Sequence, residues 1–170
     1  MTTQNRRLES TRTSRTEFSL SIRQAQISDQ DEIARMCALL WPETSIEEHR
    51  EEIGRLLTSG MYGILPATIL TCYREDGTLN GFLQVGLRSH ADGCDPSQPV
   101  GFIEGWFVYE HFRGQGIGTA LMRAAENWAR DHGCKEMASD TWIDHTRSQK
   151  AHEALGFEIV DRCVNFRKQL

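Results

Sequence analysis

The sequence predicts a single domain of mixed α/β class, in which helices flank a central sheet. Two observations support this fold class. Short apolar and β-branched runs, typical of strands, alternate with segments whose apolar residues recur at helical spacing. A chain of 170 residues is also long enough to bury one hydrophobic core. The clearest example is the stretch 100–128, where a strand-like run enters a glycine-rich turn that opens a helix.

The composition restricts the classes of function. Of the residues, 39% are hydrophobic and 25% are charged, which is ordinary for a soluble globular protein, and the net charge is −5. This balance disfavours nucleic acid as a partner and is compatible with a cationic substrate. No apolar run approaches the length of a membrane span, so we expect no membrane partner.

The cysteines and histidines predict neither a disulfide framework nor a metal site. Five cysteines are scattered without a C-x-x-C pair, and the six histidines lack zinc-ligand spacing. An odd number of scattered cysteines is typical of reduced thiols. We therefore expect a cytoplasmic protein without a metal ion.

Residues 1–17 differ in composition from the rest of the chain. They contain several arginines among Ser, Thr, Gln and Asn and almost no apolar residue, so they cannot bury enough surface to order themselves. We predict a disordered extension over 1–17 and a folded domain over 18–170. An organellar transit peptide has a similar composition and is the alternative for the extension.

The domain is expected to begin with a strand and two helices. Alternating apolar and polar residues predict a strand at 18–23. The cap-like segment Ser28-Asp29-Gln30-Asp31 opens a helix, which Trp41-Pro42 ends. A second helix is expected over about 45–59. It carries a group of acids that we interpret as a solvated face, namely Glu43, Glu47, Glu48, Glu51 and Glu52.

The rest of the domain is expected to contain mainly strands. Those at about 66–74 and 79–88 are joined by Asp76-Gly77, a strong hairpin signal. The later elements are a polar loop at 89–99, a strand from residue 100, a helix ending near His132-Gly133, a short strand at 136–139, a helix over 146–155 and a last strand over 157–167.

The turn between the central strand and its helix contains glycines at 114, 116 and 118, preceded by Arg113. Such a turn leaves backbone N–H groups unpaired at the positive end of the helix dipole, with no Cβ atoms to block a close approach, which predicts a phosphate site. The spacing fits neither the dinucleotide fingerprint nor the P-loop. Arg-x-x-Gly-x-Gly after a strand resembles the acetyl-coenzyme A loop of the GCN5-related N-acetyltransferases. A plain strand-to-helix connection is the alternative.

The resemblance covers nearly everything from residue 18 on. The expected order of elements is the acetyltransferase order, which implies a mixed central sheet whose fourth and fifth strands splay apart. The chain also resembles the aminoglycoside 6′-N-acetyltransferases, which implies transfer of acetyl to the 6′-amine of these cationic antibiotics, resistance to them, and a homodimer. The motifs that carry this resemblance are Glu104-Gly105, Trp128-Ala129, Gly133-Cys134, Glu136-Met137-Ala138-Ser139-Asp140-Thr141, Ser148-Gln149-Lys150, His152 and Ala154-Leu155-Gly156-Phe157.

The resemblance implies where acetyl-coenzyme A binds. Its pantetheine arm is expected along the central strand at Trp106, Phe107 and Val108, in the manner of an added strand. A backbone N–H near Val108 is expected to face the thioester oxygen. His145 stands where the family usually has a cofactor-contacting Asn, and it still offers one hydrogen bond. The pyrophosphate is expected on the amides of Arg113, Gly114, Gln115, Gly116, Ile117 and Gly118.

By the same resemblance, Asp140 is the expected general base, directly or through water, and Glu104 is an aminoglycoside ligand and alternative base. The alternative for Asp140 is a helix cap or turn residue. The alternative for Glu104 is a carboxylate without a function, but burying such a charged group in an apolar strand costs free energy. His152 stands where many family members have Tyr, and it either protonates the leaving thiolate or fills the space beside the sulfur.

Four positions carry a weaker expectation of substrate contact. Trp41 matches the family's aromatic floor for the sugar rings, although a tryptophan at a helix end is also typical of core packing. Thr44 and His90 stand where relatives have His and Tyr, which leaves the drug spectrum open. Asp161, in the expected last strand, stands at a carboxylate position of the substrate site.

Two other functions stay open on the sequence. One is acetylation of another small amine, such as a polyamine, and the ratio of kcat/KM for the two classes of amine distinguishes it. The other is a non-catalytic sensor that binds acetyl-coenzyme A or a cationic drug. The sensor gives no role to Asp140, Glu104 and His152 together.

Overall fold

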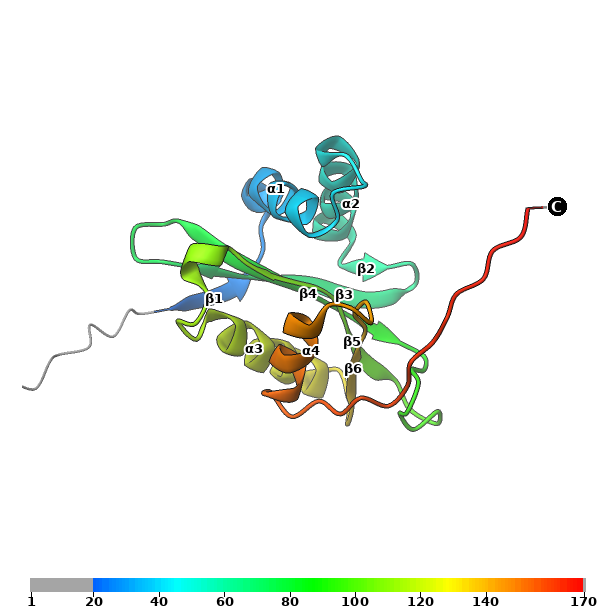
Figure 1. Ribbon diagram of the computed structural model, residues 1–170. Coiled ribbons are helices and arrows are strands. Elements are labelled where there is room, and N and C mark those ends of the chain that lie inside the picture. Colours follow the sequence, from blue (N-terminus) through cyan, green and yellow to red (C-terminus); the bar gives the residue numbers. More distant parts are fainter. Residues whose placement is uncertain (1–19, 170) are drawn as a thin grey trace, which may run out of the picture.

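The computed structural model describes residues 20–169. A six-stranded sheet lies at the centre, with α1 and α2 on one face and α3 and α4 on the other (Figure 1). The predicted disordered extension at 1–17 lies outside the described residues. The mixed α/β class is confirmed.

The helices and strands follow the predicted order as far as α4, except that the two-residue strand β2 was not predicted. In chain order they are β1 (Ser21–Gln24), the short 3-10 helix η1 (Ile27–Asp29), α1 (Gln30–Leu40), α2 (Ile46–Ser59), β2 (Met61–Tyr62), β3 (Leu65–Tyr73), β4 (Leu79–Arg88), β5 (Val100–Val108), the 3-10 helix η2 (Glu110–Phe112), α3 (Ile117–Asp131), β6 (Met137–Ser139) and α4 (Thr146–Glu153). The spatial order of the sheet is β1-β3-β4-β5-β6, with β2 paired to β3.

The core has one cluster on each face of the sheet. Apolar side chains of α1 and α2 pack over β3 and β4 around Phe82, which is fully buried. The other cluster packs one stripe of α3, including Leu121 and Ala125, against the opposite face. The expected hairpin is present, since β3 and β4 pair antiparallel across a turn in which Gly77 has a φ of 80°.

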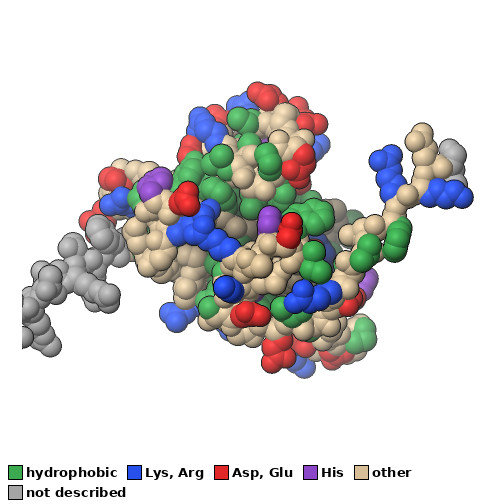
Figure 2. Space-filling model, in the orientation of Figure 1, with side chains coloured by type: hydrophobic (Ala, Val, Ile, Leu, Met, Phe, Trp, Pro, Cys, Tyr) green, Lys and Arg blue, Asp and Glu red, His purple; other side chains and the backbone are tan. Residues whose placement is uncertain are grey.

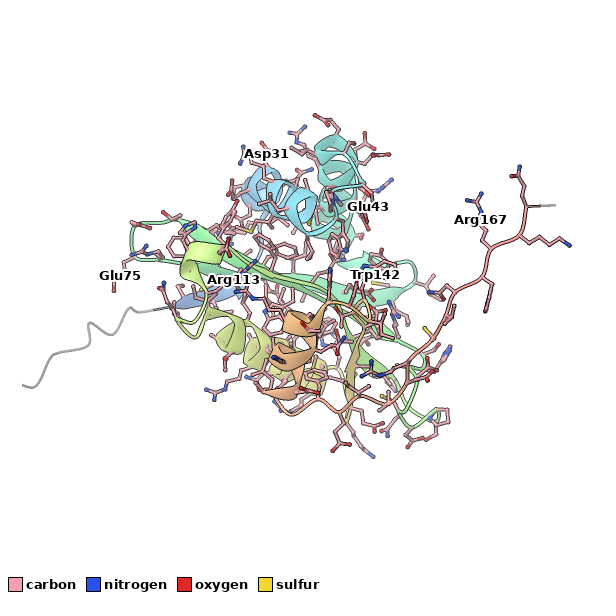
Figure 3. All side chains as sticks on the ribbon, viewed as in Figure 1. Asp31, Glu43, Glu75, Arg113, Trp142 and Arg167 are labelled. Atoms are coloured by element: carbon pink, nitrogen blue, oxygen red, sulfur yellow. The ribbon has the colours of Figure 1, made fainter. Side chains whose placement is uncertain are left out.

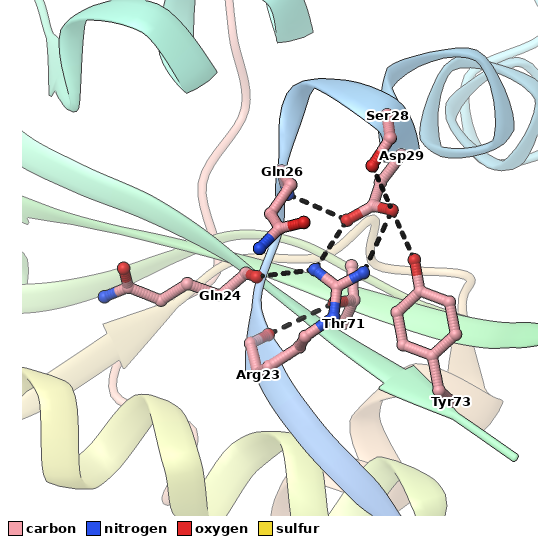
Figure 4. A network of polar contacts seen from close by, with 7 residues as sticks. All are labelled: Arg23, Gln24, Gln26, Ser28, Asp29, Thr71 and Tyr73. Carbon is pink, nitrogen blue, oxygen red and sulfur yellow. Dashed lines mark hydrogen bonds and ion pairs between the residues drawn. The ribbon is translucent and has the colours of Figure 1, made fainter. Parts of the chain in front are cut away.

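A buried carboxylate ties the first strand to α1. Asp29 is 5% exposed and accepts hydrogen bonds from both terminal nitrogens of Arg23, at 2.8 and 3.1 Å, from the Gln26 N–H and from the Tyr73 hydroxyl (Figure 4). Burial alone raises the pKa of Asp29. The hydrogen bonds from Arg23, Tyr73 and Gln26 outweigh it, so the pKa of this carboxyl lies below its ordinary value.

We expect Asp29→Asn to lower the free energy of unfolding by about 2–3 kcal/mol. This is less than the roughly 3–5 kcal/mol that is lost when one partner of a fully buried ion pair is removed. The reason is that the Arg23 side chain keeps 36% of its surface exposed. Because the folded-state pKa of Asp29 is lowered, this stabilisation is present above the unfolded pKa and is lost as pH falls through the folded one. Urea unfolding at neutral and acidic pH measures both effects.

The matched control is Asp31→Asn. Asp31 (Figure 3) pairs with Arg50 at 2.6 Å, but both side chains are more than half exposed. A surface pair of this kind contributes at most about 1 kcal/mol. Equal losses for the two substitutions would contradict the stabilising role of Asp29.

Strand β5 contains a bulge that changes which groups face its open edge. Gln84 of β4 pairs with Gly105, whereas Val85 pairs with Ile103, so Glu104 is an extra residue in β5. Such a bulge reverses the alternation of the strand beyond it. Strand β6 pairs with β5 in parallel only as far as Ile103. The second half of β5 therefore has an unpaired edge on the β6 side, which we call the open edge. This agrees with the expected splay, because the fourth and fifth strands of the prediction are β5 and β6 here.

The predicted last strand is wrong. Residues 157–169 have no regular structure, are mostly exposed, and extend away from the body of the protein (Figure 1). The apolar residues that suggested a strand are present, but a strand also needs a hydrogen-bonding neighbour. The nearest edge of the sheet is β6, which has three residues.

Candidate active site

An acidic cavity of about 250 Å³ lies between the α1–α2 pair and the sheet. Three of its carboxylates come from separate parts of the chain, namely Glu43 before α2, Glu52 within α2 and Glu104 in the β5 bulge. Figure 3 shows Glu43 on this side of the sheet. The full lining is Cys37, Trp41, Glu43, Thr44, His49, Glu52, Ile53, Tyr62, Gln84 and Glu104.

The acids that were expected to form a solvated face divide into two groups. Glu43 and Glu52 line the cavity, whereas Glu48 forms a capping box with Ser45 at the start of α2. Acidic side chains are frequent over α1 and α2 (Figure 2). The prediction of a solvated acidic face is thus correct for only some of these residues.

Trp41 packs against the core and also lines the acidic cavity. It ends α1, is half-buried and lines the cavity, and its ring lies over Gly105 of β5. A Cβ atom on Gly105 would come within 2.6 Å of the Trp41 ring, so only glycine allows this contact. His49 also contacts Trp41, with ring centroids 6.0 Å apart and His49 Nε2 3.2 Å from the Trp41 carbonyl oxygen.

Glu104 forms a bidentate ion pair with Arg88. Its oxygens accept from Arg88 Nε at 3.0 Å and from Nη2 at 2.7 Å, and the guanidinium carbon lies 3.3 Å from the centre of the Phe102 ring. Both carboxylate oxygens thus already accept from the guanidinium. This arrangement suits a ligand for a cationic substrate, since the carboxylate is held in place by Arg88. Arg88 was not predicted from the sequence, where its only signal was a charge at the end of an apolar strand.

The glycine-rich loop has the predicted shape. Gly114 and Gly116 have φ values of 74° and 83°, and Gly116 begins α3 without a capping side chain. The first amides of α3 are therefore left for a ligand. Arg113 (Figure 3) anchors the loop, because its Nε donates to the Val108 carbonyl oxygen at 2.7 Å. A Cβ on Gly118 would come within 2.8 Å of the Trp106 ring.

The bulge turns alternate backbone groups of β5 toward the open edge. The Tyr109 N–H donates to the Asn80 carbonyl oxygen of β4, so the backbone groups of residues 105, 107 and 109 face β4. Those of Trp106 and Val108 consequently face the unpaired edge. Phe107, also expected to pair with pantetheine, pairs instead with Phe82 of β4 and buries its side chain.

Three candidate residues follow β6 in the chain, and His152 contacts the open edge of β5. Asp140 follows β6 directly and is exposed. It does not cap α4, because His145 holds that position. His145 is exposed, and its side chain makes no capping hydrogen bond. His152 of α4 contacts Trp106 edge-on, with ring centroids 5.4 Å apart.

Two expected substrate residues are not among those that line the acidic cavity. His90 is exposed in the loop after β4, where its Nδ1 lies 3.1 Å from Ser89 Oγ. Asp161 lies in the irregular C-terminal segment and accepts only from the adjacent Arg162 N–H in the described contacts. Thr44, by contrast, lines the cavity as expected.

Three further findings concern the thiols, the length of the helices and possible metal ligands. All five cysteines are free thiols, and burial raises the pKa of Cys37, in the cavity wall, to about 12. Within residues 20–169, no helix is long and apolar enough to cross a membrane. The same range contains no group of three or more His, Cys, Asp or Glu side chains placed to hold a metal ion.

Comparison with known proteins shows which family the sequence matches. The acetyltransferase (GNAT) family profile matches residues 33–157. Aminoglycoside N(6′)-acetyltransferases type 1 from Klebsiella aerogenes and Stenotrophomonas maltophilia are each 39% identical to this chain. The alignments cover 88% of it and 96% and 94% of those proteins.

Solved structures of such enzymes have the same fold. AAC(6′)-Iy, in complex with the bisubstrate analogue CoA-S-monomethyl-acetylneamine, superposes with a TM-score of 0.79 at 33% identity, covering 89% of this chain and 99% of that one. AAC(6′)-Ih from Acinetobacter baumannii gives a TM-score of 0.79 at 30% identity, with the same coverage. The chain therefore belongs to the acetyltransferase (GNAT) family and, within it, to the aminoglycoside N(6′)-acetyltransferases.

Proposed function

We propose that this protein transfers the acetyl group of acetyl-coenzyme A to the 6′-amine of aminoglycoside antibiotics and thereby confers resistance. One observation carries the proposal. The bulge at Glu104 joins an open backbone edge, which ends in a phosphate-type loop, to a cavity lined by carboxylates. A thioester on that edge and a polycation in that cavity meet at one point of β5.

Several features fit acetyl-coenzyme A. The uncapped α3 and the left-handed glycines leave room and N–H donors for a pyrophosphate. The backbone of Trp106 and the Val108 N–H face this edge and fit an extended amide chain, whereas the Val108 carbonyl oxygen already accepts from Arg113 Nε. The Trp106 ring packs beneath Gly118 in the first turn of α3, so one side chain connects the open edge of β5 to the phosphate-type loop.

The proposed mechanism depends mainly on alignment. Two reactants held in attack geometry supply roughly 7–11 kcal/mol in favourable cases. Asp140 removes a proton from the ammonium, directly or through water, and the amine attacks the thioester carbonyl. A backbone N–H near Val108 on the open edge donates to the oxygen as negative charge develops. Glu104, fixed by Arg88, holds the cationic substrate, and Trp41 supports its sugar rings.

The cellular setting follows from the same chemistry. We place the reaction in the cytoplasm, where acetyl-coenzyme A is made, and assign no step to a metal ion because alignment and a carboxylate base suffice. The substrate contacts proposed for His90 and Asp161 require movement of their exposed segments toward the cavity.

We also propose a homodimer joined through the C-terminal segment 157–169. This segment exposes Ile159, Val160, Val164 and Phe166 by 49%, 62%, 75% and 93%, and Figure 2 shows hydrophobic side chains where it leaves the body. Exposed apolar residues in an extended segment are typical of a strand that pairs with another chain. The short β6 edge provides no such partner within one chain.

Sedimentation equilibrium tests the dimer. The wild-type chain should sediment as a dimer at micromolar concentration, and the double variant Val164→Asp/Phe166→Asp should dissociate at least tenfold more readily, because charge replaces apolar contact. Asn165→Asp is the control, since it adds a charge at an already polar position. A monomeric wild type would refute the dimer.

Release of coenzyme A thiol tests the proposed function. Acetyl-coenzyme A is incubated with kanamycin in one reaction and with spermidine in another. A fast release with kanamycin only supports the proposal. A release with spermidine only would replace it with polyamine acetylation, and no release despite measured cofactor binding would favour a sensor.

A further inference from the structure

His152 is held by protein groups at both ring nitrogens. Nδ1 lies 2.8 Å from the Ser148 carbonyl oxygen and 3.4 Å from Ser148 Oγ, and Nε2 lies 3.0 Å from the Ser139 hydroxyl oxygen. Because a carbonyl oxygen can only accept, Nδ1 carries a proton in the shorter contact. Nε2 is therefore the nitrogen that can gain or lose a proton, and Ser139 is its partner.

The Ser139–His152 hydrogen bond has two proton arrangements. With a neutral imidazole, the Ser139 hydroxyl donates to Nε2. With an imidazolium, Nε2–H donates to Ser139 Oγ, and the hydroxyl proton becomes free to donate to a third group. The heavy atoms keep the same partners in both arrangements, so a proton can pass without movement of the ring.

The position of the pair brings it to the proposed thioester. Ser139 is the last residue of β6 that pairs with β5, opposite Ile103, so it stands where the two strands separate. His152 packs at 89° against Trp106, which lies on the unpaired part of β5. Both Ser139 and His152 are half-buried, which limits competition by bulk water while leaving the pair accessible.

We propose that Ser139 relays a proton from His152 to the leaving sulfur. When the tetrahedral intermediate collapses, the C–S bond breaks and its electron pair goes to sulfur. Sulfur takes the Ser139 hydroxyl proton while Ser139 Oγ takes the proton of His152 Nε2, and His152 regains a proton from solvent. Over the reaction the substrate ammonium loses two protons, which balance the thiol proton and one proton released to solvent. The relay rests on the acetyl transfer proposed above.

Two nearly isosteric variants test the relay. Ser139→Thr keeps the hydroxyl and Ser139→Val removes it, so any packing effect is shared by both. The single-turnover rate of coenzyme A thiol release should fall at least tenfold in Ser139→Val, with KM for both substrates within about twofold of wild type. Ser139→Thr should retain most of the rate.

A double variant separates the relay from independent effects. Since Ser139 and His152 form one proton path, Ser139→Val/His152→Gln should be no slower than the slower single variant. Equal rates for Ser139→Val and Ser139→Thr, or losses that multiply in the double variant, would overturn the relay. If the wild type releases thiol with kanamycin, such a result removes the relay alone. An inactive wild type removes the proposed function and the relay together.

Discussion

Asp140→Asn should lower kcat by about 100-fold, because general base catalysis typically contributes at least that factor. Asp140 is exposed at the end of β6, next to the edge where β5 and β6 separate. Its amide replacement keeps the shape of the side chain and loses the basic oxygen. The affinity for acetyl-coenzyme A, measured by calorimetry, should stay unchanged, since the phosphate loop lies on a different element.

The matched control for Asp140→Asn is Asp144→Asn. Asp144 is exposed in the same connection between β6 and α4 and carries the same charge. This control should keep its turnover within about twofold of wild type, which separates a local effect of Asp140 from the loss of one negative charge. Normal turnover of Asp140→Asn would remove Asp140 as the base and direct attention to Glu104, despite its pairing with Arg88.

Gly116→Val should raise the dissociation constant of acetyl-coenzyme A more than tenfold. Gly116 adopts a φ of 83° at the first turn of α3, where a β-branched residue is strained and its side chain would cover the free amides. Loss of one or two charge-assisted contacts with the pyrophosphate corresponds to at least about 1.4 kcal/mol, or tenfold. Calorimetric titration with acetyl-coenzyme A measures the change.

Gly133→Val controls for backbone strain. Gly133 has the same φ of 83°, and as at Gly116 a Cβ added to it would meet no atom within 4 Å, but it follows the C-terminal end of α3. Both substitutions should therefore lower the melting temperature by a similar amount, while only Gly116→Val weakens binding. Similar losses of affinity in the two variants would show that stability, and not the phosphate loop, is responsible.

Local sequence signals predicted the parts of the fold that depend on neighbouring residues. Asp76-Gly77 forms its turn within four residues, and the glycines from 114 to 118 determine the loop shape through their own backbone freedom. The amphipathic stripe of α3 likewise needs only its own spacing. Each of these features was expected from the sequence and is present.

The features that were missed depend on residues far apart in the chain. The Glu104 bulge exists only in the register of β4 against β5, and Arg88 reaches Glu104 across sixteen residues of sequence. The segment Ser28-Asp29-Gln30-Asp31 was expected to open a helix, but the hydrogen bond from the Tyr73 hydroxyl, 44 residues away, to the Asp29 carboxylate was not predicted. The last strand failed for the same reason, because a strand at 157–167 requires a hydrogen-bonding neighbour, and the edge strand β6 has only three residues.

The most direct test of the proposed function compares neomycin with paromomycin. Neomycin carries an amine at the 6′ position and paromomycin a hydroxyl, and the two drugs are otherwise the same. With acetyl-coenzyme A, the protein should acetylate neomycin once, at the 6′ nitrogen by NMR of the product, and should release little thiol with paromomycin. Equal turnover of both drugs, or acetylation at another nitrogen, would contradict transfer to the 6′-amine.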